Sequence, residues 1–348
     1  MNALLWLAFL ASAALTGSWF GRSGVPAAWL FGPMLVAIGF GVAGSELRFP
    51  RAAFIAAQGV IGCLLAHAVT PDFLRGLAHD WPGMAIAVAG TIAAGALVGF
   101  LVARYGSLPG STAAWGSSVG AASAMVAMSE AHGADPRLVA LMQYLRVLSV
   151  VLSAALISRH LPGGHPVAAG AAAAVAAAPF DAVGFTGTVA VAVFGAVLGR
   201  RLGLPAGALL VPLVAGAALN ATGLVPIAPP AWLVALASAM LGSFVGLQFE
   251  RSTFIRSIRA VPEILAASAA VIALCGGLAW MLSTLGGIDP LTAFLATTPG
   301  AIETVALLAI DGGADAAYVT ATHTLRVLVV IAAGVPIARW IARRARRP

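Results

Sequence analysis

The sequence has no lysine, and only 9% of its 348 residues carry a charge. A soluble domain has about 25% charged residues. This shortage, together with 61% hydrophobic residues and a mean hydropathy of +0.99, excludes an ordinary water-soluble protein. The net charge of +7 comes entirely from arginine, and five arginines lie at the C-terminal end of the last apolar stretch: Arg339, Arg343, Arg344, Arg346 and Arg347. That position indicates a cytoplasmic flank of a membrane helix, and we predict no nucleic-acid partner.

Cysteine and paired metal ligands are also scarce. Cys63 and Cys275 each lie inside an apolar stretch, so neither a disulfide framework nor a thiolate metal cluster is predicted. The six histidines show no pair at i, i+3 or i, i+4 spacing and no Glu-x-x-His motif: His67, His79, His132, His160, His165 and His323. We therefore predict no metal site, no cofactor and no enzyme activity.

Apolar stretches long enough to approach the roughly 30 Å of a bilayer core recur along the whole chain. They cover residues 4–20, 26–43, 52–69, 84–103, 138–157, 183–198, 205–219, 232–249, 264–282 and 317–341. The first stretch lacks the basic flank of a signal peptide, so we expect it to be retained. The pattern predicts an all-α polytopic membrane protein.

Two motifs occur twice at nearly one offset. Gly-Ala-Asp and Leu-Arg-Val-Leu at 133–135 and 145–148 recur at 313–315 and 325–328, and Gly-x-Pro-Ala at 24–27 recurs at 203–206. Such a duplication in a membrane chain is typical of transporters, whose substrate path lies between the copies. We predict a first membrane repeat at 1–160, a linker at 161–182 and a second repeat at 183–348.

The arginines predict how the repeats are oriented. Clusters at 200–201, 251–259 and 339–347 are expected in the cytoplasm. All three clusters can lie on one side only if the segment near 292–310 is a broken or re-entrant helix. About five crossings per repeat then remain, and this odd number gives the two repeats opposite orientations. Both termini of this multi-pass protein then lie on the cytoplasmic side of a bacterial inner membrane. If the alanine-rich run at 167–178 also crosses, the inversion fails.

The predicted breaks are the candidate binding sites, because non-helical backbone at membrane depth is tolerated only inside protein or beside a cavity. They lie near 115–123 and 297–304. In the second, Thr298 resembles an N-cap and Pro299 the first helical residue. Candidate substrate-binding residues are Ser117, Ser118, Gly120, Ser123, Thr297, Thr298, Pro299 and Gly300. The spacing of Gly116 and Gly120 is equally typical of close helix packing without a ligand.

Arg146 and Arg326 occupy the same repeat position near mid-membrane, where an unpaired arginine costs at least about 2.5–3.5 kcal/mol. They are expected either to bind an anionic substrate or to cap the carbonyls of a broken helix, and the sequence leaves both open. Glu303 and His323 are candidate coupling residues. A histidine on a membrane helix is more often a packing residue, which also applies to Gln143.

The duplicated glycine-rich break, the Gly-Ala-Asp turn and the Leu-Arg-Val-Leu helix resemble the bacterial AbrB-type membrane proteins, which are built from two tandem copies of one domain. Members carry labels such as ammonia monooxygenase or regulator of gene expression. Their typical break reads Pro-Gly-Gly-Leu-Ser-Glu-Met. The first copy here keeps Gly120, Ser123 and Met125 but has Val119 and Ala124, and the second keeps Pro299 and Gly300 with Glu303 one place early. More distantly, the pattern resembles cation/proton antiporters and organic-anion transporters.

Three functions remain open. The first is a secondary transporter of a small anionic metabolite that works by alternating access between inverted repeats. The second is a membrane-embedded regulator that affects gene expression indirectly, since no DNA-reading motif is visible. The least favoured is a membrane monooxygenase. The expected partners are a small-molecule or ion substrate and the lipid bilayer, with a homodimer as an open alternative.

Overall fold

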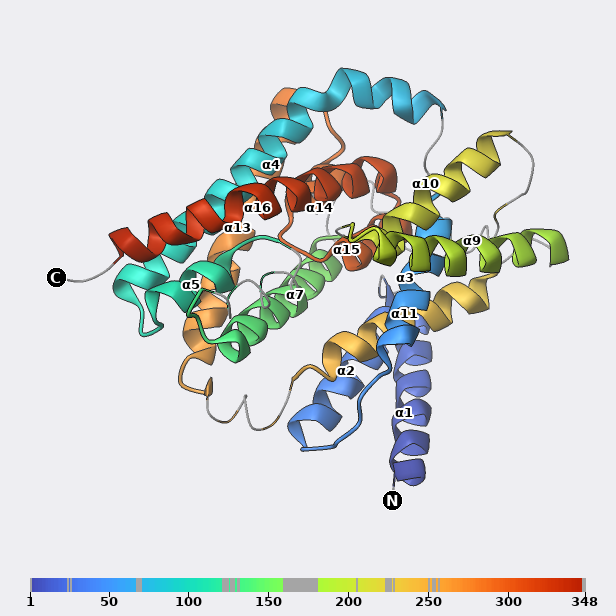
Figure 1. Cartoon of the computed structure of the whole chain (residues 1–348), viewed down its shortest axis with the longest axis horizontal. Helices are drawn as coiled ribbons and strands as arrows, with labels where there is room; N and C mark the ends of the chain where they lie inside the picture. Colours follow the sequence, from blue (N-terminus) through green and yellow to red (C-terminus); the bar gives the residue numbers. More distant parts are fainter. Residues whose placement is uncertain are drawn as a thin grey trace. The chain divides into compact units, whose positions relative to one another are not determined.

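The computed structural model of the chain is helical, with no strand among the residues that it describes (Figure 1). These are residues 2–23, 25, 27–66, 71–120, 125, 129, 132–158, 181–204, 206–222, 227, 229–230, 231–249, 251, 255 and 257–345, without the side chains of 2–3, 71–79, 155, 158, 303 and 331. The predicted linker and its alanine-rich run fall almost entirely outside them. The chain is an all-α polytopic membrane protein, as predicted.

The chain forms two compact units, and each unit combines helices from both predicted repeats. Unit 1 (residues 1–79, 157–250 and 306–318) contains α1 (Asn2–Arg22), α2 (Ala28–Val42), α3 (Arg51–Leu65), α9 (Ala182–Arg201), α10 (Gly207–Thr222) and α11 (Ala231–Gly246). Unit 2 (residues 80–156, 251–305 and 319–348) contains α5 (Gly110–Ser117), α13 (Val261–Gly286), α14 (Pro290–Thr297) and most of α4 (Pro71–Tyr105), α7 (Pro136–Ser158) and α16 (Ala316–Arg344). The chain passes from unit 2 to unit 1 within α15 (Ile302–Gly312).

The ten predicted apolar stretches all form helices, but these differ in length. Five described helices are long and apolar enough to cross a membrane: Leu4–Arg22, Asp80–Tyr105, Pro136–Ala154, Ala182–Arg201 and Val261–Gly286. A sixth is α16, which bends by 58°. Pro336 explains the bend, because it cannot donate a hydrogen bond to the preceding turn. By contrast α2, α3, α10 and α11 have only 15 or 16 residues, or about 23 Å at 1.5 Å per residue, which is shorter than the roughly 30 Å of a bilayer core.

The short helices α2 and α10 begin late for the same reason. Ala27 and Ala206, which end the two Gly-x-Pro-Ala motifs, both adopt the left-handed conformation, with φ of 50° and 52°. A residue in that region cannot continue a right-handed helix backwards. The two Gly-Ala-Asp motifs also share a conformation, since Gly133 and Gly313 have φ of 71° and 74°. Matching sequence motifs therefore have matching backbones.

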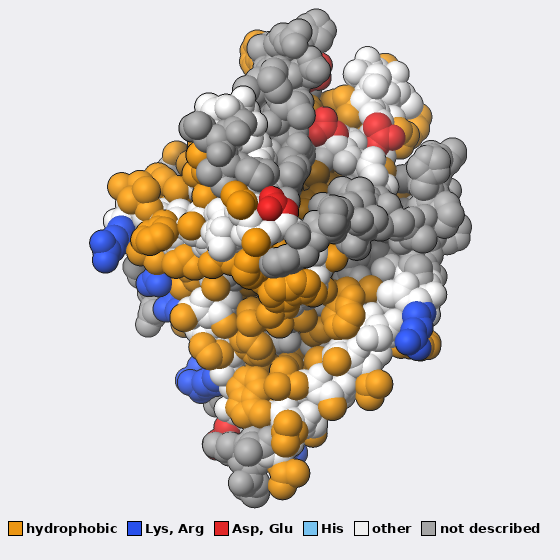
Figure 2. Space-filling model, turned by 90° about the vertical axis from the view of Figure 1, so that its right-hand side faces the viewer, with side chains coloured by type: hydrophobic (Ala, Val, Ile, Leu, Met, Phe, Trp, Pro, Cys, Tyr) orange, Lys and Arg blue, Asp and Glu red, His pale blue; other side chains and the backbone are white. Residues whose placement is uncertain are grey.

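Unit 1 packs through close helix pairs, α1 with α2, α2 with α11, and α3 with α9, α10 and α11. Its outer surface is apolar: on α1 and α9, Leu4, Leu15 and Phe194 are 76%, 71% and 75% exposed. In Figure 2 hydrophobic side chains dominate the described part of the visible face, and charged ones are few. Apolar exposure on this scale suits lipid rather than water.

In unit 2, both predicted helix breaks are confirmed. α5 ends at Ser117, and α14 ends at Thr297, with non-helical backbone at 118–120 and 298–301. The prediction that Thr298 caps the following helix is wrong: Thr298 is the C-cap of α14, and α15 begins three residues after Pro299. The cause is Pro299, which forces the residue before it out of the helical region. Thr298 accordingly has φ −60° and ψ 136°.

Candidate functional site

The candidate site lies in unit 2, where the two breaks meet the two membrane-depth arginines. Arg326 lies on α16, ten residues after Ala316, or roughly 15 Å along the helix axis. It is 2% exposed. Its Nη1 donates to the Thr298 carbonyl and its Nη2 to the Gly300 carbonyl, each at 2.8 Å. Arg326 thus holds the open C-terminal end of α14, whose last carbonyls have no partner in the helix itself.

Arg146 does the same for the first break and also reaches the second. It lies on α7 and is 4% exposed. Its Nη1 donates to the Ser118 carbonyl at 2.9 Å, and its Nε donates to the Pro299 carbonyl at 3.0 Å. A single guanidinium therefore connects the backbones of the two breaks.

The residue one turn before each arginine completes the pattern. Gln143 Nε2 contacts the carbonyls of Trp115, Gly116 and Ser118 at 3.0–3.3 Å, and its Oε1 accepts from Arg146. His323 Nε2 lies 3.0 Å from the Leu295 carbonyl, and its Nδ1 lies 3.1 Å from Arg326 Nη2. A carbonyl can only accept, so Nε2 carries the proton and Nδ1 accepts from the arginine. This arrangement suits a neutral imidazole.

Each break also packs against the arginine helix of the other half. A Cβ at Gly120 would lie 2.9 Å from Val330 Cγ1 on α16, and a Cβ at Gly300 would lie 3.2 Å from Val150 Cγ1 on α7. Val150 and Val330 are separated by the same 180 residues as the two glycines. A Cβ at Gly120 or Gly300 would therefore lie in space that the valine side chain already occupies.

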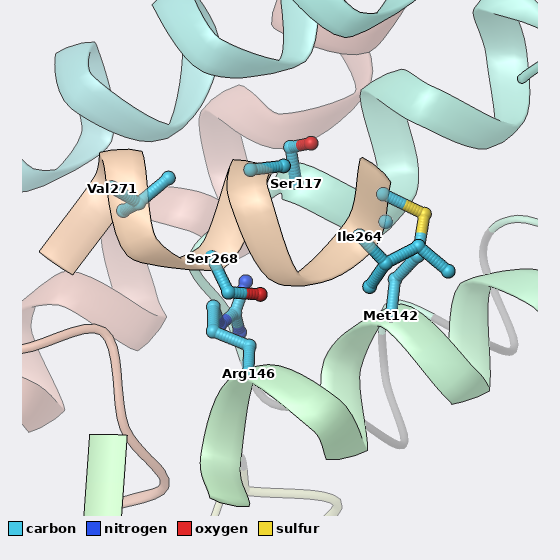
Figure 3. Close-up of a pocket in the computed structure, with 8 residues that line it drawn as sticks. Ser117, Met142, Arg146, Ile264, Ser268 and Val271 are labelled. Atoms are coloured by element: carbon cyan, nitrogen blue, oxygen red, sulfur yellow. The ribbon is translucent and has the colours of Figure 1, made fainter. Parts of the chain in front are cut away.

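A small pocket lies beside the first break, between α5, α7 and α13. Its lining consists of Gly116, Ser117, Met142, Arg146, Ile264, Ala267, Ser268 and Val271. Figure 3 shows Arg146 projecting from α7 toward α13, where Ser268 points back at it. Ser117 is 5% exposed, and its buried hydroxyl has no hydrogen-bond partner. The Thr298 hydroxyl and Arg326 Nε are also buried without a partner.

The structure brings most of the predicted site residues together. Ser118, Thr298, Pro299 and Gly300 contribute backbone carbonyls to the arginines, whereas the hydroxyl of Thr297 bonds inside the protein. Two predictions lie outside the described residues, namely Ser123 and the side chain of Glu303. A direct role of these residues in binding or coupling stays a prediction.

The sequence analysis missed part of the site. Gln143 was treated only as a packing residue, although it is the repeat counterpart of His323 at an offset of 180. The correspondence between Gln143 and His323 was the signal that could have identified Gln143 as a site residue. For Met142, one turn before Arg146 on α7, and for Ser268 on α13, no sequence pattern indicated a place in the site. Among the described residues no group of three His, Cys, Asp or Glu side chains is placed to hold a metal ion.

Comparison with known proteins identifies the family. The family described as "Transition state regulatory protein AbrB" matches residues 29–342. The chain belongs to the AbrB family. This AbrB-family protein is 42% identical over 318 residues, 91% of each chain, to the Escherichia coli (strain K12) protein "Putative regulator AbrB". It is 26% identical over 360 residues, 98% of this chain and 94% of the relative, to "Uncharacterized protein YhjN" of Bacillus subtilis (strain 168).

No solved structure matches the chain. The resemblance inferred from the duplicated break and the Leu-Arg-Val-Leu helix is thereby confirmed at the level of the family. The name of the Escherichia coli relative refers to regulation, and none of the names mentions transport.

Proposed function

We propose that this AbrB-family protein is a secondary transporter of a small anion, located in the bacterial inner membrane. The observation that carries this proposal is the pair of buried arginines at the helix breaks of unit 2. Interrupted helices near mid-membrane are where transporters commonly hold their substrates. Buried charged side chains at that depth mark substrate or ion paths more often than packing sites.

The charge balance at the arginines favours an anion. Within the described part of the chain, every partner of the two guanidinium groups is a carbonyl, an amide oxygen or an imidazole nitrogen, and none is a carboxylate. Carbonyls at a helix C-terminus supply only about half a negative charge per helix. Two full positive charges exceed what the two helix ends neutralise, and they outnumber the one acidic residue near the breaks, Glu303, whose side chain lies outside the described residues. A bound anion would balance the remainder.

The proposed mechanism is alternating access between inverted repeats, with both termini in the cytoplasm. Its support is that each compact unit combines corresponding helices of the two halves and that paired motifs share backbone angles. In transporters built from inverted repeats, one repeat moves against the other so that a fixed substrate site opens to each side of the membrane in turn. Reporter fusions after Gly164 and after Pro348 test the orientation: inversion requires opposite sides of the membrane, and a same-side result would exclude it.

The transport test uses the full chain in liposomes loaded with buffer. Uptake of labelled butyrate, succinate, citrate and inorganic phosphate is compared with empty liposomes. We expect at least one anion to accumulate and Arg326→Ala and Glu303→Gln to reduce its uptake by at least about tenfold. Arg326→Lys keeps the charge and serves as the folding check. Arg339→Ala, an exposed arginine on the same helix, is the matched control and should transport normally. Absence of uptake of every anion by folded protein would refute the proposal.

A second candidate, supported by the names of the family and of the Escherichia coli relative, is regulation of gene expression. We propose that any such effect is indirect and follows from altered metabolite levels. Transcript changes should then disappear in a strain carrying Arg326→Ala at normal protein abundance. Changes that persist without transport would favour a direct regulatory role instead.

A further inference from the structure

The last part of α16 has one buried face and one exposed basic face. In the segment Ala332–Arg344, the side chains of Ala338 and Ile341 are buried in the apolar core of unit 2. At about 100° per residue, the residues between them turn to the opposite side of the helix. Three arginines and one tryptophan are exposed on that side: Arg339, Trp340, Arg343 and Arg344.

Trp340 is fixed in this face by two neighbours. Its ring centroid lies 6.0 Å from that of Phe100 on α4, and Arg344 Cζ lies 5.5 Å from the centroid of the same indole ring. A Cβ at Gly99 would lie 3.6 Å from Ile341 Cδ1, so α4 passes close to this turn of α16. The two helices end on the same side of unit 2, near the C-terminus (Figure 1). Trp340 nevertheless remains 48% exposed, so its ring is free to contact a ligand.

The exposed face carries positive charge that the protein does not neutralise. No acidic residue follows Asp315 in the sequence, whereas Arg346 and Arg347 extend the basic series. Among the described residues, no carboxylate pairs with any of the three exposed arginines. Glu263, an acidic residue beside the end of α4, uses both carboxylate oxygens to accept from the backbone N–H and the hydroxyl of Ser107. The face is therefore complementary to an anion.

The surrounding surface indicates which kind of anion fits. On α4, Leu97, Leu101 and Tyr105 are 50%, 43% and 72% exposed, and their spacing of four residues places them on one side of the helix. Both α4 and the bent helix α16 are long and apolar enough to cross a membrane, so their ends lie near its surface. Tryptophan and tyrosine are enriched at that level, because the ring lies among apolar groups while its polar edge reaches water. An anion beside exposed hydrocarbon at this level is a phospholipid headgroup.

We propose that the basic face of α16 binds the headgroup of an anionic phospholipid of the phosphatidylglycerol type. The lipid phosphate accepts from Arg343 and Arg344, whose planar donors match its geometry. The glycerol backbone lies against Trp340, and the acyl chains lie along the exposed apolar side chains of the membrane-spanning helices. A zwitterionic headgroup is disfavoured, because its own cationic group would lie among the remaining arginines. This site is separate from the helix breaks and goes beyond the proposed transport function.

Binding is measured on the purified full chain in detergent, as the rise in apparent melting temperature during titration with dioctanoyl phosphatidylglycerol. Dioctanoyl phosphatidylcholine and inorganic phosphate are the comparison ligands. Each arginine beside an anionic lipid contributes about fivefold in affinity, so half-maximal stabilisation should need at least about tenfold less phosphatidylglycerol than phosphatidylcholine. Inorganic phosphate at the same concentrations should give no stabilisation, since it has no hydrocarbon to place beside Trp340.

Two double variants test the arginines. Arg343→Gln combined with Arg344→Gln should raise the half-maximal concentration of phosphatidylglycerol by about tenfold or more. Arg200→Gln combined with Arg201→Gln is the matched control, because it removes another exposed pair of adjacent arginines, in the last turn of α9 in unit 1. The control should titrate like the unchanged protein. Melting temperatures without lipid check that both double variants fold, as expected for exposed positions.

A tryptophan variant distinguishes a defined site from a general attraction of positive charge. Trp340→Leu keeps every charge but removes the ring beside Arg344, so phosphatidylglycerol binding should weaken about twofold to fivefold. Trp280→Leu on α13, where the tryptophan is 72% exposed, should leave binding unchanged.

The proposal is overturned if phosphatidylcholine or inorganic phosphate stabilises the protein as well as phosphatidylglycerol does, or if the α16 double variant titrates like the α9 control. Unchanged binding by Trp340→Leu would also exclude this site. These outcomes are independent of transport: absence of anion uptake would leave the lipid site intact, and absence of lipid preference would leave the transporter intact.

Discussion

The two helix breaks have the same backbone but differ in which of their buried polar groups have hydrogen-bond partners. Gly120 N–H donates to the Ser118 carbonyl at 3.1 Å, and Gly300 N–H donates to the Thr298 carbonyl at 2.9 Å. Side chains do not follow this symmetry. The threonine hydroxyl at 297, before the second break, is hydrogen-bonded, whereas the serine hydroxyl at 117, before the first break, is buried without a partner. The two breaks thus leave different polar groups without a partner, the Ser117 hydroxyl at the first and the Thr298 hydroxyl with Arg326 Nε at the second.

The largest expected difference concerns the two glycines. Gly300→Ala would place a methyl against Cγ2 of Val305, a residue whose χ1 is stiff in a helix, and 3.2 Å from Val150 Cγ1. Gly120→Ala would meet Met125, which can move aside, and Val330 at 2.9 Å. Overpacking costs about 1–3 kcal/mol. We expect the destabilisation by Gly300→Ala to lie at the upper end of this range and that by Gly120→Ala at the lower end. Both are measured as a fall in the apparent melting temperature in detergent.

Two further variants control this comparison. Gly276→Ala on α13 has nothing within 4 Å of the new methyl and should leave the melting temperature unchanged or raise it. Gly300→Ala combined with Val305→Ala removes the contact and should recover part of the loss. Equal losses for Gly120→Ala and Gly300→Ala would mean that both breaks are equally rigid.

A smaller difference is expected between Gln143 and His323. Gln143→His can reach only one of the three carbonyls that the amide contacts, so at least one buried carbonyl loses a partner at a cost of about 1–3 kcal/mol. His323→Gln can still donate to the Leu295 carbonyl and accept from Arg326, and should cost less than about 1 kcal/mol. Melting temperatures of the two single variants decide this. A larger loss for His323→Gln would show that the ring shape, rather than its hydrogen bonds, matters.

The sequence was sufficient to predict the positions of the helices, both breaks and the central arginines. Hydrophobic runs indicate the helices, and motifs repeated at one offset indicate the breaks and the arginines, so no knowledge of distant contacts is needed. It also predicted that each arginine would meet either an anion or a carbonyl. It could not predict which carbonyls, since Arg146 bonds Pro299, 153 residues away. The error at Thr298 arose from treating it as the start of the next helix, although a residue before proline more often ends one.

Whether a hydroxyl at the break is satisfied was beyond the sequence as well. Ser117 and Thr297 both occupy the last helical position before a break. The Thr297 hydroxyl contacts the Ala293 and Phe294 carbonyls of its own helix at 2.9 and 3.2 Å and the Cys275 carbonyl of α13 at 3.1 Å. The Ser117 hydroxyl bonds neither its own helix nor a neighbour, and the local pattern does not indicate which of the two orientations a hydroxyl adopts.

The smallest stability effect should fall on these two hydroxyls. Thr297→Val keeps the shape of the side chain and removes a single donor that lies within reach of three carbonyls, so we expect a loss of about 1 kcal/mol. Ser117→Ala removes a hydroxyl that bonds nothing in the protein, and should change stability by less than about 0.5 kcal/mol or slightly raise it. Melting temperatures without added anion measure both. A loss at Ser117 as large as that at Thr297 would mean that the hydroxyl is satisfied in the unliganded protein. The helix ends at Ser117 and Thr297 would then be equally well hydrogen-bonded.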